Sequence, residues 1–521
     1  MAVVLDWRGD QIIITEEVVK AAARNSHNGE EVMTLLLDRQ GDQITITEEV
    51  VKAAAGNSDS GEEVMTLLLD RQGDQITITE EVVKAAAGNS RSGEKVMTLL
   101  LDRRGDQITI TEEVVKAAAG NSWDGEKVMT LLLDRRGDQI TITEEVVKAA
   151  AGNSRSGEKV MTLLLDRRGD QITITEEVVK AAAGNSRSGE KVMTLLLDRR
   201  GDQITITEEV VKAAAGNSDS GEKVMTLLLD RRGDQITITE EVVKAAAGNS
   251  WDGEKVMTLL LDRRGDQITI TEEVVKAAAG NSRSGEKVMT LLLDRRGDQI
   301  IITEEVVKAA AGNSGNGGKV MTLLLDRRGD QITITEEVVK AAAGNSRSGE
   351  KVMTLLLDRR GDQITVTEEV VKAAAGNSDS GEKVMTLLLD RRGDQITITE
   401  EVVKAAVGNS DSGEKVMTLL LDRRGDQITI TEEVVKAAAG NSRSGEKVMT
   451  LLLDRRGDQI TITEEVVKAA AGNSSNGGKV MTLLLDRRGD QITITEEVVK
   501  AAAGNSSNRE NVMTLLLNQR G

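Results

Sequence analysis

The chain has 521 residues and a net charge of −19, with no cysteine, no proline and 1% aromatic residues. The lack of cysteine excludes disulfides and thiolate metal sites and suits a reducing compartment. The acidic excess, spread evenly along the chain, favours solubility and argues against a nucleic-acid partner.

One unit of 32 residues is repeated along the whole chain. Met33, Met65 and Met97 mark the period, which continues to Met513. We expect sixteen repeats over residues 9–520 to form one solenoid domain, preceded by an incomplete repeat, the remnant of a second helix, at 1–8. Neither end has the polar capping unit that solenoids generally need, so we expect the chain to be a fragment of a longer protein.

The sequence also bears on the compartment. No apolar run approaches the eighteen or so residues that a membrane span requires. The first residues, "MAVVLDWRGD", lack the basic region and long apolar stretch of a signal peptide. We therefore expect a cytoplasmic protein with no membrane partner.

Each unit begins with a short link, which a first helix follows. In the link "DQITIT", Ile108 and Ile110 alternate with polar residues over a stretch too short for an independent strand. The segment "TEEVVKAAAG" predicts a helix that begins after Thr111 as N-cap, with acids in its first turn and Gly120 as a left-handed stop. Its Glu and Lys at i,i+4 predict a stabilising pair, as for Glu112 with the lysine four residues later.

The second helix is predicted over 125–136, "GEKVMTLLLDRR". Asp124 stands at its N-cap, Val128 and Leu132 share one face, and two arginines occupy the last turn, where positive charge suits the helix end. Gly137 is expected to end it.

Neither helix is long enough to be stable alone, and each is apolar over a wide arc. Stacked units would bury these faces against each other. We therefore expect an all-α fold, a right-handed α-solenoid of helix–turn–helix, ankyrin-like repeats with a short extended Ile-Thr-Ile link between units.

The segment "GEKVMTLLLDRRGDQI" resembles the second helix of an ankyrin repeat, whose pattern is Val-Val-x-Leu-Leu-Leu-x-x-Gly-Ala-Asp-Val. The first helix departs from that family because it lacks Pro-Leu-His, and the link is too short for the ankyrin hairpin. The unit is more similar to the degenerate ankyrin-like arrays of filamentous fungi, which often follow a NACHT-type domain in intracellular, NLR-like receptors of non-self recognition. That resemblance implies a sensor or scaffold and nothing catalytic.

Other motifs have plain structural interpretations. "RGD", as at Arg104-Gly105-Asp106, is more consistent with a helix end than with an adhesion ligand. The arginine pairs could bind polyanions, but helix-end electrostatics explains them better. His27 is the sole histidine, and no nucleophile–base pair or metal cage is evident. We expect no enzyme activity, no metal and no cofactor.

One position varies freely between otherwise near-identical units. Six residue types occupy it, while the next residue is always Ser, Asp or Asn, which are preferred N-cap residues. The row of variable residues is His27, Asp59, Arg91, Trp123, Arg155, Arg187, Asp219, Trp251, Arg283, Gly315, Arg347, Asp379, Asp411, Arg443, Ser475 and Ser507.

Two interpretations of this row stay open. The first is diversified recognition of a protein or peptide ligand, because the row mixes Trp and Arg, the types that most often anchor interfaces. The second is a structural scaffold or spacer array without a specific ligand, in which the most tolerant turn position drifts. We expect a protein or peptide partner, and no nucleic acid, membrane or small-molecule substrate.

Overall fold

The computed structural model describes residues 14–40, 44–73, 76–505 and 507–518. As predicted, the fold is an all-helical solenoid of helix–turn–helix repeats, and none of the described residues lies in a strand. Contacts between Cα atoms divide the chain into two compact units, Met1–Ile268 and Thr269–Gly521, and each is described by itself. The incomplete repeat expected at 1–8 lies outside the described residues.

In the first unit, each repeat contributes a first helix, a second helix and, in most repeats, a 3-10 turn. The first helices are α2 (Glu16–Arg24), α4 (Glu48–Ala55), α6 (Glu80–Gly88), α8 (Glu112–Gly120), α10 (Glu144–Gly152), α12 (Glu176–Gly184), α14 (Glu208–Gly216) and α16 (Glu240–Gly248). The second helices are α3 (Gly29–Gln40), α5 (Gly61–Gln72), α7 (Gly93–Arg104), α9 (Gly125–Arg136), α11 (Gly157–Arg168), α13 (Gly189–Arg200), α15 (Gly221–Arg232) and α17 (Gly253–Arg264). The 3-10 turns are η4 (Gly105–Gln107), η5 (Gly137–Gln139), η6 (Gly169–Gln171), η7 (Gly201–Gln203), η8 (Gly233–Gln235) and η9 (Gly265–Gln267).

The second unit repeats the same order. Its first helices are α18 (Glu272–Gly280), α20 (Glu304–Gly312), α22 (Glu336–Gly344), α24 (Glu368–Ala375), α26 (Glu400–Gly408), α28 (Glu432–Gly440), α30 (Glu464–Gly472) and α32 (Glu496–Gly504). Its second helices are α19 (Gly285–Arg296), α21 (Gly317–Arg328), α23 (Gly349–Arg360), α25 (Gly381–Arg392), α27 (Gly413–Arg424), α29 (Gly445–Arg456), α31 (Gly477–Arg488) and α33 (Arg509–Asn518). Its 3-10 turns are η10 (Gly297–Gln299), η11 (Gly329–Gln331), η12 (Gly361–Gln363), η13 (Gly393–Gln395), η14 (Gly425–Gln427), η15 (Gly457–Gln459) and η16 (Gly489–Gln491).

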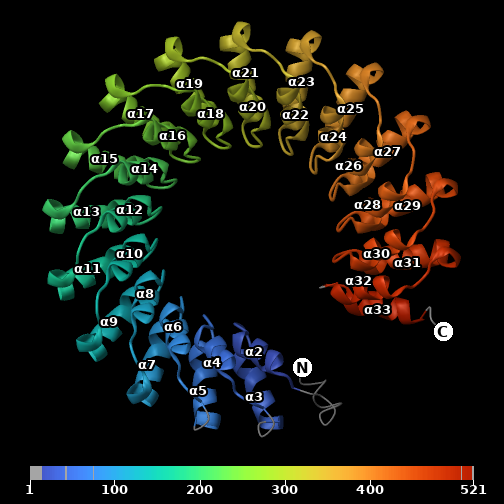
Figure 1. Cartoon of the computed structure of the whole chain (residues 1–521). Helices are drawn as coiled ribbons and strands as arrows, with labels where there is room; N and C mark the ends of the chain where they lie inside the picture. The colour runs from blue at the N-terminus through green and yellow to red at the C-terminus, as the bar shows by residue number, and fades with distance from the viewer. Residues whose placement is uncertain (1–13, 41–43, 74–75, 506, 519–521) are drawn as a thin grey trace. The chain divides into compact units, whose positions relative to one another are not determined.

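Within each unit the repeats stack in register, as can be followed from α8 to α15 in Figure 1. A first helix contacts the first helices of the adjacent repeats and the second helix of its own repeat, and second helices contact one another in the same way. The first helices pack more closely together than the second helices do, because their contact face is built from valine and alanine. Short alanine side chains permit this close approach.

The core of each repeat is a continuous apolar layer. In α8 the buried residues are Val114, Val115, Ala118 and Ala119, and in α9 they include Val128, Met129, Leu132 and Leu133. The link contributes Ile108 and Ile110, each 6% exposed, while the threonine between them faces solvent. The alternation in the sequence therefore marks an extended link that seals the layer, and the described links form no strand ladder.

The predicted left-handed stop at Gly120 is wrong, whereas α9 ends at Arg136 with Gly137 as its C-cap, as predicted. Every glycine in the described part of the chain has φ outside the left-handed region. Gly120 is the last residue of α8, which ends at the extended Asn121, and Gly137 has φ −53° and leads from α9 into the 3-10 turn η5. The helices end by tightening into i,i+3 turns, as where the Asn121 N–H donates to the Ala118 carbonyl at 3.2 Å, so no left-handed residue is required.

The predicted i,i+4 pair is also wrong. Lys116 Nζ lies 3.0 Å from Glu113 Oε1, at i,i+3. Glu112 is engaged elsewhere, because its Oε1 accepts a hydrogen bond from the Thr143 hydroxyl of the next repeat at 2.6 Å.

Candidate binding surface

The turn between the two helices of a repeat is held by one buried asparagine. Asn153 is 3% exposed, and its Nδ2 donates to the carbonyl oxygens of Ala119 and Asn121 in the preceding repeat, each at 2.9 Å. Its Oδ1 accepts from the backbone N–H groups of Arg155 at 3.2 Å and Ser156 at 3.1 Å. The side chain thus closes its own turn and joins it to the turn before.

This asparagine recurs throughout the described repeats, for example as Asn89, Asn217 and Asn409. From the sequence, no role was assigned to this asparagine, and only the variable residue and the N-cap residue of the turn were considered. The available signal was an asparagine that never changes, standing two residues before a position that changes freely. A buried amide with four or five partners explains why this residue is fixed.

The residue after each variable position stands at the N-cap, but its predicted capping bond is absent. Neither Asp124 nor Ser156 makes a side-chain cap bond to its helix. The Ser156 hydroxyl donates to the Asn121 carbonyl of the preceding turn at 2.9 Å. Asp124 instead lies 3.7 Å from Lys127. The restriction to Ser, Asp and Asn therefore reflects contacts between turns and with the neighbouring lysine.

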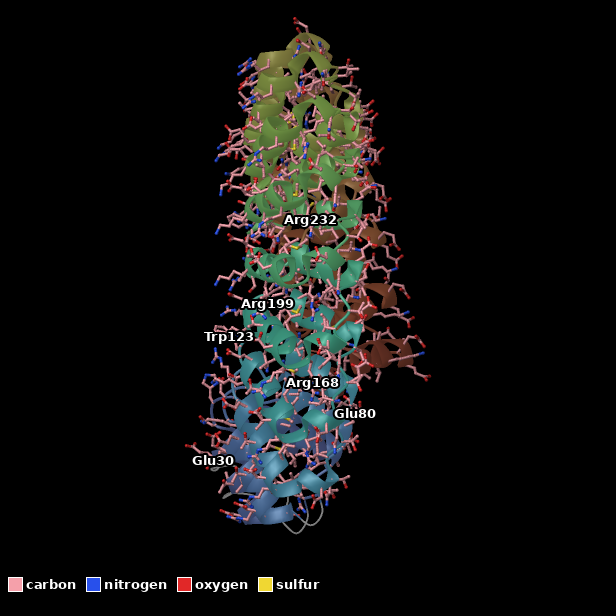
Figure 2. All side chains as sticks on the ribbon, turned by 90° about the vertical axis from the view of Figure 1, so that its left-hand side faces the viewer. Glu30, Glu80, Trp123, Arg168, Arg199 and Arg232 are labelled. Atoms are coloured by element: carbon pink, nitrogen blue, oxygen red, sulfur yellow. The ribbon has the colours of Figure 1, made fainter. Side chains whose placement is uncertain are left out.

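The sixteen variable residues, called here the row, are all exposed. Trp123 is 55% and Trp251 58% exposed, which is unusual for the largest side chain. Figure 2 shows Trp123 at one edge of the first unit and Glu80 at the opposite edge. The row therefore runs along the edge formed by the turns, away from the starts of the first helices.

Neighbouring row residues contact each other in a fixed direction. Arg91 Nη1 lies 2.8 Å from Asp59 Oδ1 of the preceding repeat. The Arg155 guanidinium lies 3.5 Å from the centroid of the Trp123 ring, in a cation–π contact with the preceding repeat. The side chain of a row arginine thus points toward the preceding repeat. The row residue of that preceding repeat determines whether the arginine has a partner.

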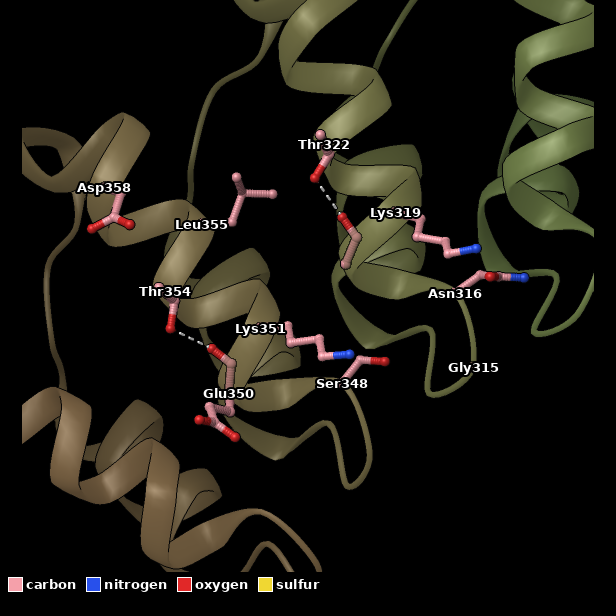
Figure 3. A pocket seen from close by; sticks show the side chains of 11 residues that line it. Gly315, Asn316, Lys319, Thr322, Ser348, Glu350, Lys351, Thr354, Leu355 and Asp358 are labelled. Carbon is pink, nitrogen blue, oxygen red and sulfur yellow. Dashed lines mark hydrogen bonds between the residues drawn. The ribbon is translucent and has the colours of Figure 1, made fainter.

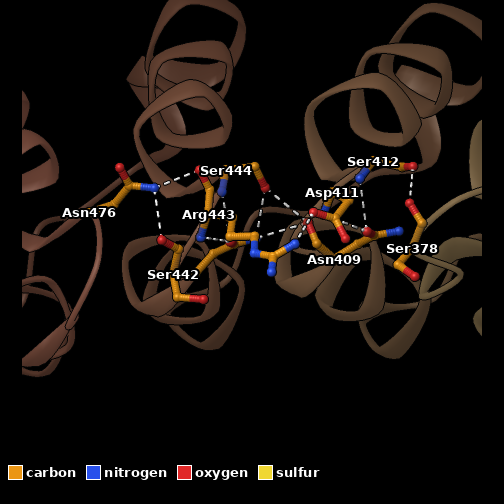
Figure 4. A network of polar contacts seen from close by, with 9 residues as sticks. Ser378, Asn409, Asp411, Ser412, Ser442, Arg443, Ser444 and Asn476 are labelled. Carbon is orange, nitrogen blue, oxygen red and sulfur yellow. Dashed lines mark hydrogen bonds and ion pairs between the residues drawn. The ribbon is translucent and has the colours of Figure 1, made fainter. Parts of the chain in front are cut away.

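The second unit repeats this arrangement (Figure 4), where Arg443 Nη1 meets Asp411 Oδ1 at 2.8 Å. This hydrogen bond raises the pKa of Arg443 above its ordinary value. Below the pair, Asn409 Oδ1 accepts the Asp411 N–H at 3.2 Å, and the Ser444 hydroxyl donates to the Asn409 carbonyl at 2.9 Å. The row side chains therefore stand on an ordered polar layer.

The direction of reach leaves some row charges without a partner. Arg187 follows Arg155, and Arg347 follows Gly315, so neither has an acidic row residue before it. Among the described residues, no ion pair involves Arg187 or Arg347. These guanidinium groups, exposed on the row, are available to a ligand.

The arginine pairs at the ends of the second helices are occupied within the solenoid. Arg135 Nη1 lies 2.9 Å from Asp102 Oδ1, and Arg136 Nη2 donates to the Gly105 carbonyl at 2.6 Å. Arg136, the arginine of one "RGD" motif, is therefore held by the preceding repeat, in keeping with the interpretation of that motif as a helix end.

The edge opposite the row carries a second inter-repeat ladder. The Thr111 hydroxyl makes no cap bond and instead donates to Glu80 Oε1 at 2.7 Å. Hydrogen bonds from Lys84 first, and then from Lys52, hold the pKa of Glu81 below its ordinary value. The acids at the helix starts thus interact favourably with the helix dipole and also bind threonine and lysine side chains of the neighbouring repeats.

In the described part of the chain, no group of three or more His, Cys, Asp or Glu residues is placed to hold a metal ion. Each helix of that part is too short or too polar to cross a lipid bilayer.

One protein family matches sixteen consecutive segments, from 3–33 to 483–513, and its description is "Domain of unknown function (DUF7104)". No curated protein matches the sequence. Among solved structures, the chain is similar to the pentatricopeptide repeat protein PPR10 from maize, with a TM-score of 0.33 and 12% identity over 100% of this chain and 81% of that one. PPR10 in complex with an 18-nt psaJ RNA element gives a TM-score of 0.41 and 12% identity over 99% of this chain and 81% of that one. A PPR10 variant with the same RNA element gives the same values.

The expectation that nucleic acid is excluded as a partner is wrong as it stood, and two of the structures reported above hold an RNA element. Acidic net charge was the ground for that exclusion, and a net charge does not describe the local surface of an extended array. The net charge of the chain therefore does not exclude nucleic acid as a partner. At 12% identity the likeness assigns no ligand to this chain.

Proposed function

The chain belongs to the DUF7104 family, whose description states no function, and we propose that it is a non-catalytic repeat array that binds a protein or peptide through the row. The helical array is the scaffold, and the sixteen row residues are the part that differs from repeat to repeat.

One observation carries this proposal: the backbone beneath the row is fixed while the side chains on it vary. The N–H groups of Trp123, Arg155 and Asp219 all donate to the asparagine two residues before them, at 3.2 to 3.3 Å. Different side chains are thus presented from the same turn geometry. Binding surfaces on repeat proteins are built in this way, by changing side chains on a rigid scaffold.

The chemistry of the row suits a protein surface. Trp123 with Arg155 on its ring presents a flat patch that combines an aromatic face with a guanidinium edge. Tryptophan and arginine are the residues most enriched where interface energy is concentrated. The unpaired Arg187 adds a charge that can select acidic groups on the ligand.

We also propose a biological setting, which is supported by the sequence resemblance alone. Arrays of this kind in filamentous fungi stand in intracellular, NLR-like receptors, so the array would be the ligand-sensing part of such a receptor in the cytoplasm. A spacer array without a ligand is the alternative outcome of the test below.

The test is selection of binders from a phage-displayed peptide library on the full chain. Each enriched peptide is labelled with fluorescein and titrated by anisotropy against the native chain and against a row variant with the tryptophans, arginines and histidine of the row changed to Ser. A control variant carries the same number of changes at the exposed glutamines of the 3-10 turns. Since each interface anchor typically contributes more than about 2 kcal/mol, the row variant should bind at least thirtyfold more weakly. The control should stay within about twofold of the native chain.

Three results would overturn the proposal. Enriched peptides that bind the row variant as tightly as the native chain would place the site elsewhere. Failure of any peptide to be enriched in repeated selections would favour the spacer array. A labelled 18-nt single-stranded RNA that binds more tightly than every peptide, with loss in the row variant, would assign the row to RNA.

A further inference from the structure

The second unit contains a groove where the repeating pattern is broken. Its volume is about 510 Å³, and it lies between α21 and α23 (Figure 3). Gly315 and Gly318 line one wall, and Lys351, Thr354 and Leu355 line the other. In most repeats a glutamate stands where Gly318 is, so the groove exists because that side chain is missing.

The missing glutamate has an electrostatic consequence. Along the second helices, a lysine of one repeat pairs with the glutamate of the repeat before it. Lys319 lies 2.8 Å from Glu286, and Lys383 lies 3.1 Å from Glu350. Lys351 stands between these pairs and faces Gly318, and no ion pair of the described residues involves it.

The same repeat also removes the partner of a row arginine. Arg347 would reach toward row position 315, as Arg443 reaches toward Asp411, but a glycine stands there. Two glycines in one repeat therefore leave two cations of the next repeat, Arg347 and Lys351, without acids. An accessible lysine without an acidic partner, beside a hollow lined mostly by polar residues with Leu355 as its one aliphatic side chain, is suited to an incoming carboxylate.

We propose that this groove binds an acidic peptide segment, one of whose carboxylates takes the place of the missing glutamate on Lys351. The proposal does not rest on the proposed function of the row, because Lys351 and Gly318, which define the site, are not row residues, although Gly315 and Arg347 are. Leu355 and the methyl group of Thr354 give an apolar wall for a neighbouring aliphatic side chain. Glu350 and Asp358 border the groove and would repel the continuous charge of a phosphate backbone. A peptide can instead place one carboxylate on Lys351 and turn uncharged atoms toward these two acids, so a peptide fits better than RNA.

The chain contains its own negative control. Gly478 also replaces the glutamate, but the residue facing it is Asn511 and the next row residue is Ser507. That junction lacks the glutamate without freeing a cation. If a missing side chain alone made a site, both junctions would bind, and if the freed cation is required, only the junction at Gly318 would.

The experiment titrates the full chain with a fluorescein-labelled peptide, Gly-Glu-Leu-Glu-Leu-Glu-Gly, and with its glutamine-for-glutamate counterpart. The glutamate peptide should bind with a dissociation constant in the micromolar range that weakens with salt, and the glutamine peptide at least tenfold more weakly. Gly318→Glu restores the acid found in neighbouring repeats, and Lys351→Gln removes the cation. Each should weaken binding at least tenfold with an unchanged melting temperature.

A rescue variant builds the same junction at another place in the chain. Copying the sequence of residues 315–318 into an earlier repeat, as Arg155→Gly, Ser156→Asn and Glu158→Gly, removes the acid that pairs with Lys191 at 3.1 Å. In the Lys351→Gln background, these three changes should restore binding of the glutamate peptide.

The proposal is overturned if Gly318→Glu leaves the affinity unchanged, if the rescue variant does not bind, or if the glutamine peptide binds equally well. It is also overturned if a labelled 18-nt single-stranded RNA binds more tightly than the peptide and is released by Gly318→Glu. The library test can fail independently: if the selected peptides bind the row variant as tightly as the native chain, the proposed function of the row is wrong. The groove at Lys351 would still be supported by the titrations described above.

Discussion

The buried asparagine of each turn gives the most direct test of how the repeats hold together. In the variant Asn153→Ala, the amide that joins two consecutive turns is removed from a site that is 3% exposed. Two polar groups then lose their partners inside the protein: the Ala119 carbonyl, bound at 2.9 Å, and the Ser156 N–H, bound at 3.1 Å. The Asn121 carbonyl keeps the Ser156 hydroxyl at 2.9 Å.

The expected cost follows from these two orphaned groups. A buried donor or acceptor without a partner costs about 1–3 kcal/mol, so the variant should lose about 3–4 kcal/mol of local stability. The N–H of Arg155 adds little, because its residue is exposed and water can replace the lost acceptor. Since repeats contact only their neighbours, the loss should stay local.

Hydrogen exchange followed by mass spectrometry measures this loss repeat by repeat. Amide protection in α8–α11 should fall by about a hundredfold or more, with little change in the second unit. Thr141→Ala, an exposed change in the same repeat, is the control and should stay within about 0.5 kcal/mol. If Asn153→Ala also stays within about 0.5 kcal/mol of the native chain, the asparagine does not join the two turns.

Three further predictions concern packing, pH and the row. A methyl group at Gly125 would lie 3.0 Å from both the Ala118 carbonyl and the Ser156 hydroxyl, so Gly125→Ala should lower the free energy of unfolding in urea by about 1–3 kcal/mol. A methyl group at Gly120 would lie 3.9 Å from its nearest neighbour, so Gly120→Ala should be neutral or stabilising. Equal effects of the two changes would refute this. The pKa of Glu81 in the folded chain is lowered from 4.5, so the ionised carboxylate stabilises the fold above pH 4.5. This contribution is lost as the pH falls through the lowered folded pKa, so the melting temperature should fall on acidification below about pH 4.5. A rise in melting temperature would contradict the stabilising contacts between Glu81 and the lysines of the helix starts. Changing Trp123 and Arg155 together to Ser removes one exposed cation–π contact and should cost less than about 1 kcal/mol by calorimetry; a larger loss would make the pair structural and not a ligand surface.

The repeat length, the two helices and the apolar faces followed from the sequence, because helix periodicity and copied units are local signals. Val128 and Leu132 were assigned to one apolar face by spacing, and both are buried. The helix ends were harder, since a glycine can end a helix in several ways. Gly137 leads into a 3-10 turn that packs against the next repeat. A methyl group on Gly137 would lie 2.9 Å from the Arg168 guanidinium of that repeat.

Contacts between repeats could not be derived from one unit in isolation. The roles of Asn153 and Thr111 both depend on acceptors about 32 residues earlier, and a reading of local capping rules assigned Thr111 to its own helix. The row itself was located correctly as exposed, because free variation in a copied array points to surface. That neighbouring row residues pair, as Arg91 does with Asp59, required the structure.

The most direct test of the proposed function uses the row's own tryptophan as the reporter. With Trp7 and Trp251 changed to Phe, the emission comes from Trp123 alone, which is 55% exposed. The titrant is a library-selected peptide that no longer binds when the Trp123 repeat is altered. Its binding should shift the emission to shorter wavelength, because the ligand covers the Trp123 ring and excludes water. Unchanged emission at saturation would show that the ligand does not contact the row at Trp123, and would contradict the account.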